Sequence, residues 1–130
     1  MKANEIMLGD ILQGFLPDTY MRVVGIPNEY RLEVVTANGT YMELSIDDVR
    51  PIELTPEILE KNEFEHISRS SYYDYDDGEG VIVRCDTWNK RLKIIRDLNV
   101  VYDSGDYADI YVYILQHALK LTDIDKEIIV

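Results

Sequence analysis

The sequence predicts an α+β protein: a small SH3-like β-barrel followed by an antiparallel sheet with one packed C-terminal helix. Three observations predict this class. Four short strand-like segments separated by turns occupy the first part, a second set of alternating segments begins near residue 70, and one helical pattern lies near the C-terminus. We expect two subdomains, residues 1–53 and 54–130, which a chain of 130 residues can join into one compact unit.

The expected barrel is built from four short strands. They cover residues 10–15, 20–25, 30–36 and 40–45, with turns at Leu16–Asp18 and Ile26–Glu29. A single turn of helix is expected at 45–49. Four short strands that close on one helical turn are typical of small barrels.

Asn38 and Gly39 mark a hairpin whose register can be deduced. A two-residue loop would leave neither face of the hairpin apolar. A loop of three residues, 37–39, places Val34 opposite Met42 and gives one coherent apolar face. We therefore predict the three-residue loop, with Gly39 in the left-handed conformation.

A short helix is expected immediately after the barrel. Thr55 can accept hydrogen bonds from the first-turn amides, and Pro56 suits the first helical position. A helix of about two turns is not stable alone, so it must dock on a neighbouring element. We expect Asn62, which tolerates the left-handed conformation, to close it.

The second part is expected to form a sheet covered by a helix. Strands are predicted at 70–75, 81–86, 91–96 and 99–102, and the four-residue turn at 87–90 places Cys85 opposite Leu92. A helix follows, with Asp109 as its N-cap, and is expected to lie across the sheet. Residues 128–130 are either a closing strand or a frayed end.

Three segments resemble an uncharacterised family of small bacterial proteins that is common on phages and mobile elements. Residues 51–65, PIELTPEILEKNEFE, resemble the family's PIPLTEEILLKNGFE segment; residues 7–10 resemble its RIGN pattern, and 111–119 its YVHELQHAL helix. Glu63 replaces the usual Gly and Tyr113 the frequent His. The resemblance implies an architecture and a bacterial or phage origin, and it implies no catalytic residue.

The chain is strongly acidic, with a formal net charge of −12 at pH 7. Phosphate contacts need Lys and Arg, so this charge argues against binding to nucleic acid or to an anionic membrane. It fits a solvated acidic surface, a basic partner, or mimicry of DNA. Cys85 is the only cysteine, which excludes an internal disulfide, and the first residues lack the apolar run of a signal peptide. We expect a cytoplasmic protein.

No residue pattern predicts a catalytic or metal site. Residues 74–79, DYDDGE, have the wrong register for a calcium loop, because Glu79 stands where a sharp turn is needed. Cys85 with His66 or His117 could be drawn as a nucleophile and base, but Cys85 falls on the apolar face of its strand. We therefore expect no metal, no cofactor and no enzymatic activity.

The hairpin around the only tryptophan is the candidate partner-binding site. Its residues are Trp88, Lys90, Arg91 and Lys93. Trp and Arg are enriched at binding hot spots. The sequence favours, over this binding role, an ordinary solvent face with the tryptophan packed over it.

Three functions remain open on the sequence. The first is a non-enzymatic interaction or accessory protein that binds an unknown protein partner. The second is an acidic DNA mimic that inhibits a DNA-binding protein. The third is a small enzyme of unrecognised class. No heptad pattern demands self-association, so we expect a monomer or a weak homo-oligomer.

Overall fold

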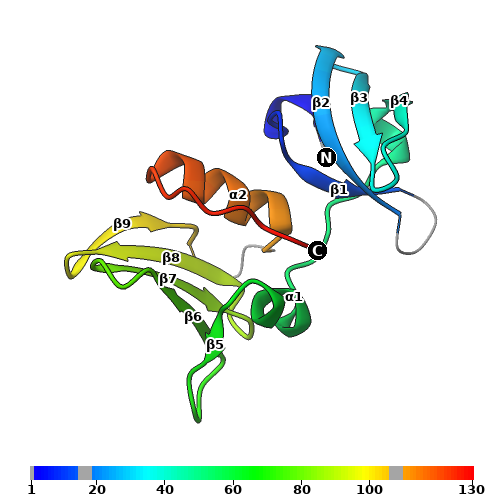
Figure 1. Ribbon diagram of the computed structural model, residues 1–130. Helices are drawn as coiled ribbons and strands as arrows, with labels where there is room; N and C mark the ends of the chain where they lie inside the picture. Colours follow the sequence, from blue (N-terminus) through cyan, green and yellow to red (C-terminus); the bar gives the residue numbers. More distant parts are fainter. Residues whose placement is uncertain (1, 15–18, 106–109) are drawn as a thin grey trace. The chain divides into compact units, whose positions relative to one another are not determined.

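A computed structural model describes residues 2–14, 19–105 and 110–130 (Figure 1). These residues form two antiparallel sheets and one main helix near the C-terminus, which confirms the α+β class. The chain divides into two compact units, Met1–Ile52 and Glu53–Val130, and each is described by itself.

The first unit is a four-stranded sheet in the order β1-β2-β3-β4. Its elements are η1 (Ala3–Glu5), β1 (Ile11–Gln13), β2 (Tyr20–Asn28), β3 (Arg31–Thr36), β4 (Tyr41–Ser45) and the helical turn η2 (Ile46–Asp48). Alternate side chains of β2 and β3 are buried, as the period of two requires. The buried apolar residues of this unit are Ile6, Ile11, Leu12, Met21, Val23, Leu32, Val34, Ile46, Val49 and Ile52.

The β3–β4 hairpin has the predicted three-residue loop. Val34 lies opposite Met42, and the Thr36 amide donates to the Thr40 carbonyl at 2.9 Å. Gly39 has a φ of 86°, the left-handed conformation expected of it. The apolar face of the hairpin is only partly covered. Val34 is fully buried, whereas Met42 is 37% exposed.

The sheet of the first unit is open and does not form a closed barrel among the described residues. One isolated bridge extends it beyond η2. Gln13 and Arg50 exchange two backbone hydrogen bonds, of 2.9 and 2.7 Å. The chain thus returns to the free edge of β1 for one residue pair.

Strand β2 corrects one sequence prediction. It continues to Asn28, so most of the turn expected at Ile26–Glu29 is strand, and the actual turn is Glu29–Tyr30. Two irregularities in the β2–β3 register allow the strand to bend past Pro27. The Asn28 carboxamide oxygen accepts from the Tyr30 amide at 2.8 Å and stabilises this tighter turn. The turn predicted at 16–18 lies outside the described residues.

The second unit is a five-stranded antiparallel sheet, β5-β6-β7-β8-β9, with α2 over one face (Figure 1). Its elements are α1 (Pro56–Lys61), β5 (Glu65–His66), β6 (Tyr72–Asp76), β7 (Val81–Asp86), β8 (Arg91–Arg96), β9 (Asn99–Asp103) and α2 (Val112–Leu121). The predicted pairing of Cys85 with Leu92 is confirmed. The N-cap of α2 is Tyr111, without a side-chain cap, and Asp109 lies outside the described residues.

One face of this sheet and one side of α2 supply the core. The buried apolar side chains of the strands and of α2 are Val81, Val83, Cys85, Leu92, Ile94, Val112, Tyr113, Leu115, Ala118 and Leu119. Burying apolar surface is the main favourable term in folding. The opposite face of the sheet, which we call the outer face, is not covered by α2.

Helix α1 begins at its N-cap, Thr55, and is closed by Asn62, as predicted, but Asn62 is not the left-handed residue. The Thr55 hydroxyl accepts from the Ile58 amide at 3.3 Å. The left-handed residue at its end is Glu63, with φ 70°, whereas Asn62 has φ −102°. Glu63 therefore takes the conformation that Gly takes in many helix C-caps.

The Asn62 side chain is buried because it holds the last residues of the chain. Its Nδ2 donates to the carbonyls of Ile58 and Ile129, both at 2.7 Å, and its Oδ1 accepts from the Ile129 amide at 2.7 Å. Ile128 is 2% exposed. Residues 128–130 are thus neither a strand nor a frayed end.

Candidate functional site

The outer face of the five-stranded sheet carries charged and aromatic side chains in register. Asp74, Arg84 and Lys93 lie opposite one another on β6, β7 and β8. Arg84 binds Asp74 through two hydrogen bonds, of 2.9 and 2.8 Å, and lies 4.7 Å from the centre of the Tyr72 ring. This paired arrangement raises the pKa of Arg84, chiefly through its hydrogen bonds with Asp74, and keeps the guanidinium charged.

The candidate hairpin begins at the end of β7, and Asp86 organises its turn. The Asp86 carboxylate accepts from the amides of Trp88 and Asn89, each at 3.1 Å, and from the Asn89 side chain at 2.9 Å. It also accepts from the Ser71 hydroxyl at 2.5 Å. Asp86 itself is buried. Two amides of this turn are therefore held by one carboxylate, and the Thr87 amide donates to the Ser71 carbonyl at 3.1 Å.

These hydrogen bonds also set the charge of Asp86. Burial raises its pKa, but the hydrogen bonds from Ser71, Asn89 and Trp88 together outweigh burial, and the pKa lies below its ordinary value. Asp86 is thus a carboxylate at neutral pH. An ionised group can accept all four hydrogen bonds without giving up an oxygen to a proton.

Trp88 stands at the tip of this turn and is 82% exposed. The interpretation in which the tryptophan packs over the hairpin is therefore wrong. An aromatic ring of this size left in water forgoes the free energy that its burial would supply. Trp88 is an apolar group on a well-ordered loop that the fold itself leaves uncovered.

The basic side chains of the hairpin are more neutralised than the sequence indicates. Lys90 lies 3.2 Å from a Glu53 carboxylate oxygen, and Arg91 binds Asp103 at 3.0 and 2.5 Å. The bond to Arg91 is the first cause that lowers the pKa of Asp103 to about 2. Lys93 forms no ion pair with a described residue. The hairpin therefore presents an aromatic ring with a weakly cationic border.

The residues that could have formed a thiol-based site do not have the properties it requires. Cys85 is fully buried, and burial raises the pKa of its thiol, so it is not a thiolate at neutral pH. His66 is exposed and stacks on Tyr73, with ring centres 4.9 Å apart. His117 is half-buried on α2 against Tyr113. The structure assigns each of the three a packing contact.

The acidic segment after β6 is a hairpin turn, as its composition indicates. The Asp76 carboxylate accepts from the Gly78 amide at 2.8 Å, and the Asp77 carboxylate accepts from the amides of Glu79 and Val81 at 2.7 and 3.1 Å. These bonds are typical of Asx turns. In the portions of the chain that the structure describes, no group of three or more His, Cys, Asp or Glu residues could hold a metal ion.

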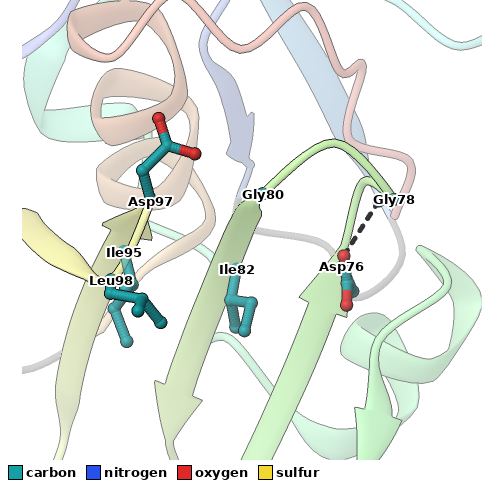
Figure 2. Close-up of a pocket in the computed structure, with 7 residues that line it drawn as sticks. All are labelled: Asp76, Gly78, Gly80, Ile82, Ile95, Asp97 and Leu98. Carbon is teal, nitrogen blue, oxygen red and sulfur yellow. Dashed lines mark hydrogen bonds between the residues drawn. The ribbon is translucent and has the colours of Figure 1, made fainter.

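Sequence reasoning missed a hollow at the other end of the same outer face (Figure 2). It lies where the β6–β7 and β8–β9 turns approach each other. Its volume is about 540 Å³, and it is lined by Asp76, Gly78, Gly80, Ile82, Ile95, Asp97 and Leu98. The one signal of this hollow in the sequence was Asp97-Leu98, which forms a two-residue turn without glycine or asparagine. Whether the Leu98 side chain is exposed depends on the fold.

Comparison of the chain with models of protein families, with curated proteins and with solved structures found no match. None of the described helices combines the length and apolar character needed to cross a membrane. The candidate site is therefore interpreted from its own geometry.

Proposed function

We propose that the protein acts by binding another protein, without catalysing a reaction, and that the β7–β8 hairpin makes the contact. The observation that carries this proposal is Trp88, 82% exposed on a turn that Asp86 holds in place. Tryptophan is strongly enriched among residues that dominate binding energy. A preordered loop loses little conformational entropy on binding, which raises affinity.

The proposal includes the kind of protein and its setting. The resemblance of three segments to proteins of phages and mobile elements supports an accessory protein of bacterial or phage origin. A single, buried cysteine suits a reducing cytoplasm. The Gln13–Arg50 bridge, which brings the chain back to β1 after η2, supports an SH3-like relationship for the first unit.

The test uses Trp88→Ala in affinity capture from a bacterial lysate. The tag is placed at the N-terminus, because Ile129 and Val130 take part in hydrogen bonds. Leu121→Ala is the matched control, since Leu121 is also apolar and 74% exposed in the second unit. We expect a partner that the wild type and the control retain and that Trp88→Ala loses, with affinity reduced about 30-fold or more.

Fluorescence then checks the contact directly, because the chain has only one tryptophan. Binding of the purified partner should shift the emission of Trp88 to shorter wavelength as water leaves the ring. A partner that binds without changing this emission contradicts the assignment of the face. A basic DNA-binding partner captured equally by all three baits would favour DNA mimicry instead.

A further inference from the structure

The hollow at the Asp97–Leu98 end of the second unit has the features of a binding site. It lies at the end of β7 and β8 opposite the Trp88 turn, as the hairpin topology requires. Its floor is the cross-strand pair Ile82 and Ile95. A volume of about 540 Å³ falls within the range of small ligand pockets.

Leu98 forms one wall in an unfavourable conformation. Asp97 and Leu98 are the two central residues of the β8–β9 turn and have φ values of 51° and 71°. Turns of this kind favour Gly or Asn, because a bulky side chain is strained at positive φ. Leu98 is also 97% exposed. A strained apolar residue held in water at the edge of a hollow is a candidate functional residue.

Two glycines border the hollow. Gly78 and Gly80 have φ values of 77° and 95°, and a Cβ at Gly80 would lie only 2.6 Å from the Asp97 carboxylate. The Asp97 amide donates to the Gly80 carbonyl at 3.0 Å, which joins the two turns. The walls of the hollow are thus tied together by the backbone.

One carboxylate faces the apolar floor. Asp76 lies opposite Ile82 in the sheet register and shares its face, whereas the Asp97 carboxylate points the other way (Figure 2). Asp76 Oδ1 accepts a hydrogen bond from the Gly78 amide at 2.8 Å. Neither aspartate forms an ion pair with a described residue. A cation at the hollow would therefore meet an uncompensated negative charge.

We propose that this hollow binds a lysine side chain presented by a basic segment of another protein. The aliphatic stem would pack on Ile82, Ile95 and Leu98, while the ammonium binds Asp76. Lysine fits better than arginine because one oxygen of Asp76 already accepts a backbone hydrogen bond, and a guanidinium prefers two free oxygens. The net charge of −12 favours the approach of a basic partner.

The surface beside the hollow indicates a protein segment rather than a free amine. Val100 on the edge strand β9 lies opposite Ile95 of the floor and is 55% exposed. A residue that flanks the lysine could cover this exposed valine, whereas a small amine could not. The proposal does not depend on the Trp88 hairpin, so either can fail alone.

The test is an NMR titration of the uniformly ¹⁵N-labelled chain with the blocked tripeptide Ac-Leu-Lys-Leu-NH₂. We expect the largest shift changes at the amides of Gly78, Gly80, Ile95 and Leu98. The same peptide acetylated at the lysine Nε keeps the stem and loses the charge, and should bind much more weakly. Equal binding of both peptides, or shift changes spread over the whole acidic surface, would overturn the proposal.

Two variants and a control locate the site. Asp76→Asn keeps the acceptor for the Gly78 amide but removes the charge, and should weaken the peptide about threefold or more. Leu98→Gly should also weaken binding, whereas Glu60→Gln, which removes an exposed charge on α1, and Trp88→Ala should not. Unchanged affinity in both Asp76→Asn and Leu98→Gly would refute the site. If n-hexylamine binds as tightly as the peptide, the assignment to a protein partner is wrong.

Discussion

The two turns that bound β8 present an apolar side chain to water in opposite ways. At one end, Trp88 stands on a turn in which its own amide and that of Asn89 donate to a buried carboxylate, Asp86. At the other end, Leu98 occupies a two-residue turn at positive φ, in which the Asn99 side chain donates to the Asp97 carbonyl at 3.2 Å. The first turn has one non-glycine residue at positive φ, Lys90 at 55°, and a buried carboxylate that holds it, whereas the second has two such residues in succession. The exposure of an apolar residue therefore does not by itself indicate a function, and the conformation of its backbone must be known as well.

Removal of Asp86 should produce the largest effect. Asp86→Ala leaves the Ser71 hydroxyl and three donors of the turn without their buried acceptor. We expect a loss of about 2–4 kcal/mol in the free energy of unfolding, measured by urea denaturation. The anisotropy of Trp88 fluorescence should fall, because the tip loosens. Glu60→Ala is the control and should change stability by less than about 0.5 kcal/mol. If Asp86→Ala matches this control, Asp86 does not hold the turn.

The Asp86 carboxylate should also make the free energy of unfolding depend on pH in the acidic range. The pKa of Asp86 is lower in the folded protein than its ordinary value of 3.8. Its contribution is therefore complete above that value and is lost as the pH falls through the lower, folded pKa. The stability difference between the wild type and Asp86→Asn should shrink between about pH 5 and pH 2. A difference that stays constant in urea titrations over this range would show that the ionised form of Asp86 is not favoured by folding.

Relief of the strained turn should give the smallest effect, with the opposite sign. Leu98→Gly removes a side chain that is unfavourable at φ 71°, and we expect a gain of about 1 kcal/mol in the free energy of unfolding. Leu98→Asn should give part of this gain, because Asn tolerates the left-handed conformation. Thermal and urea unfolding measure both. If both variants lose stability, Leu98 contributes packing that its 97% exposure does not indicate.

The hairpin registers were predictable because each depends on local rules. Loop length and the period of two determine which residues face each other, so the pairs Val34–Met42 and Cys85–Leu92 could be deduced without a structure. The start of α1 at Thr55 was equally local. By contrast, the sequence did not predict that β2 continues through Pro27, nor that residues 65–66 form the short strand β5. Such segments are stabilised only by pairing with the neighbouring strand.

The candidate site was predictable only in part. Its residue types drew attention to Trp88, but whether that ring is packed or exposed depends on the tertiary fold, and the favoured interpretation was wrong. The ion pairs of Lys90 with Glu53 and of Arg91 with Asp103 join residues 37 and 12 positions apart. The hollow by Leu98 needs two turns brought together, so no single segment of sequence could reveal it.

The hydrogen bonds between Asn62 and Ile129 have a topological consequence. They join positions 67 residues apart and place the last residues of the second unit beside its first helix. A unit whose entry and exit lie side by side is well suited to circular permutation, in which a short linker joins the old ends and new ends are opened elsewhere. The exposed turn at Gly78 is one place where such a cut would leave every buried strand of the sheet intact.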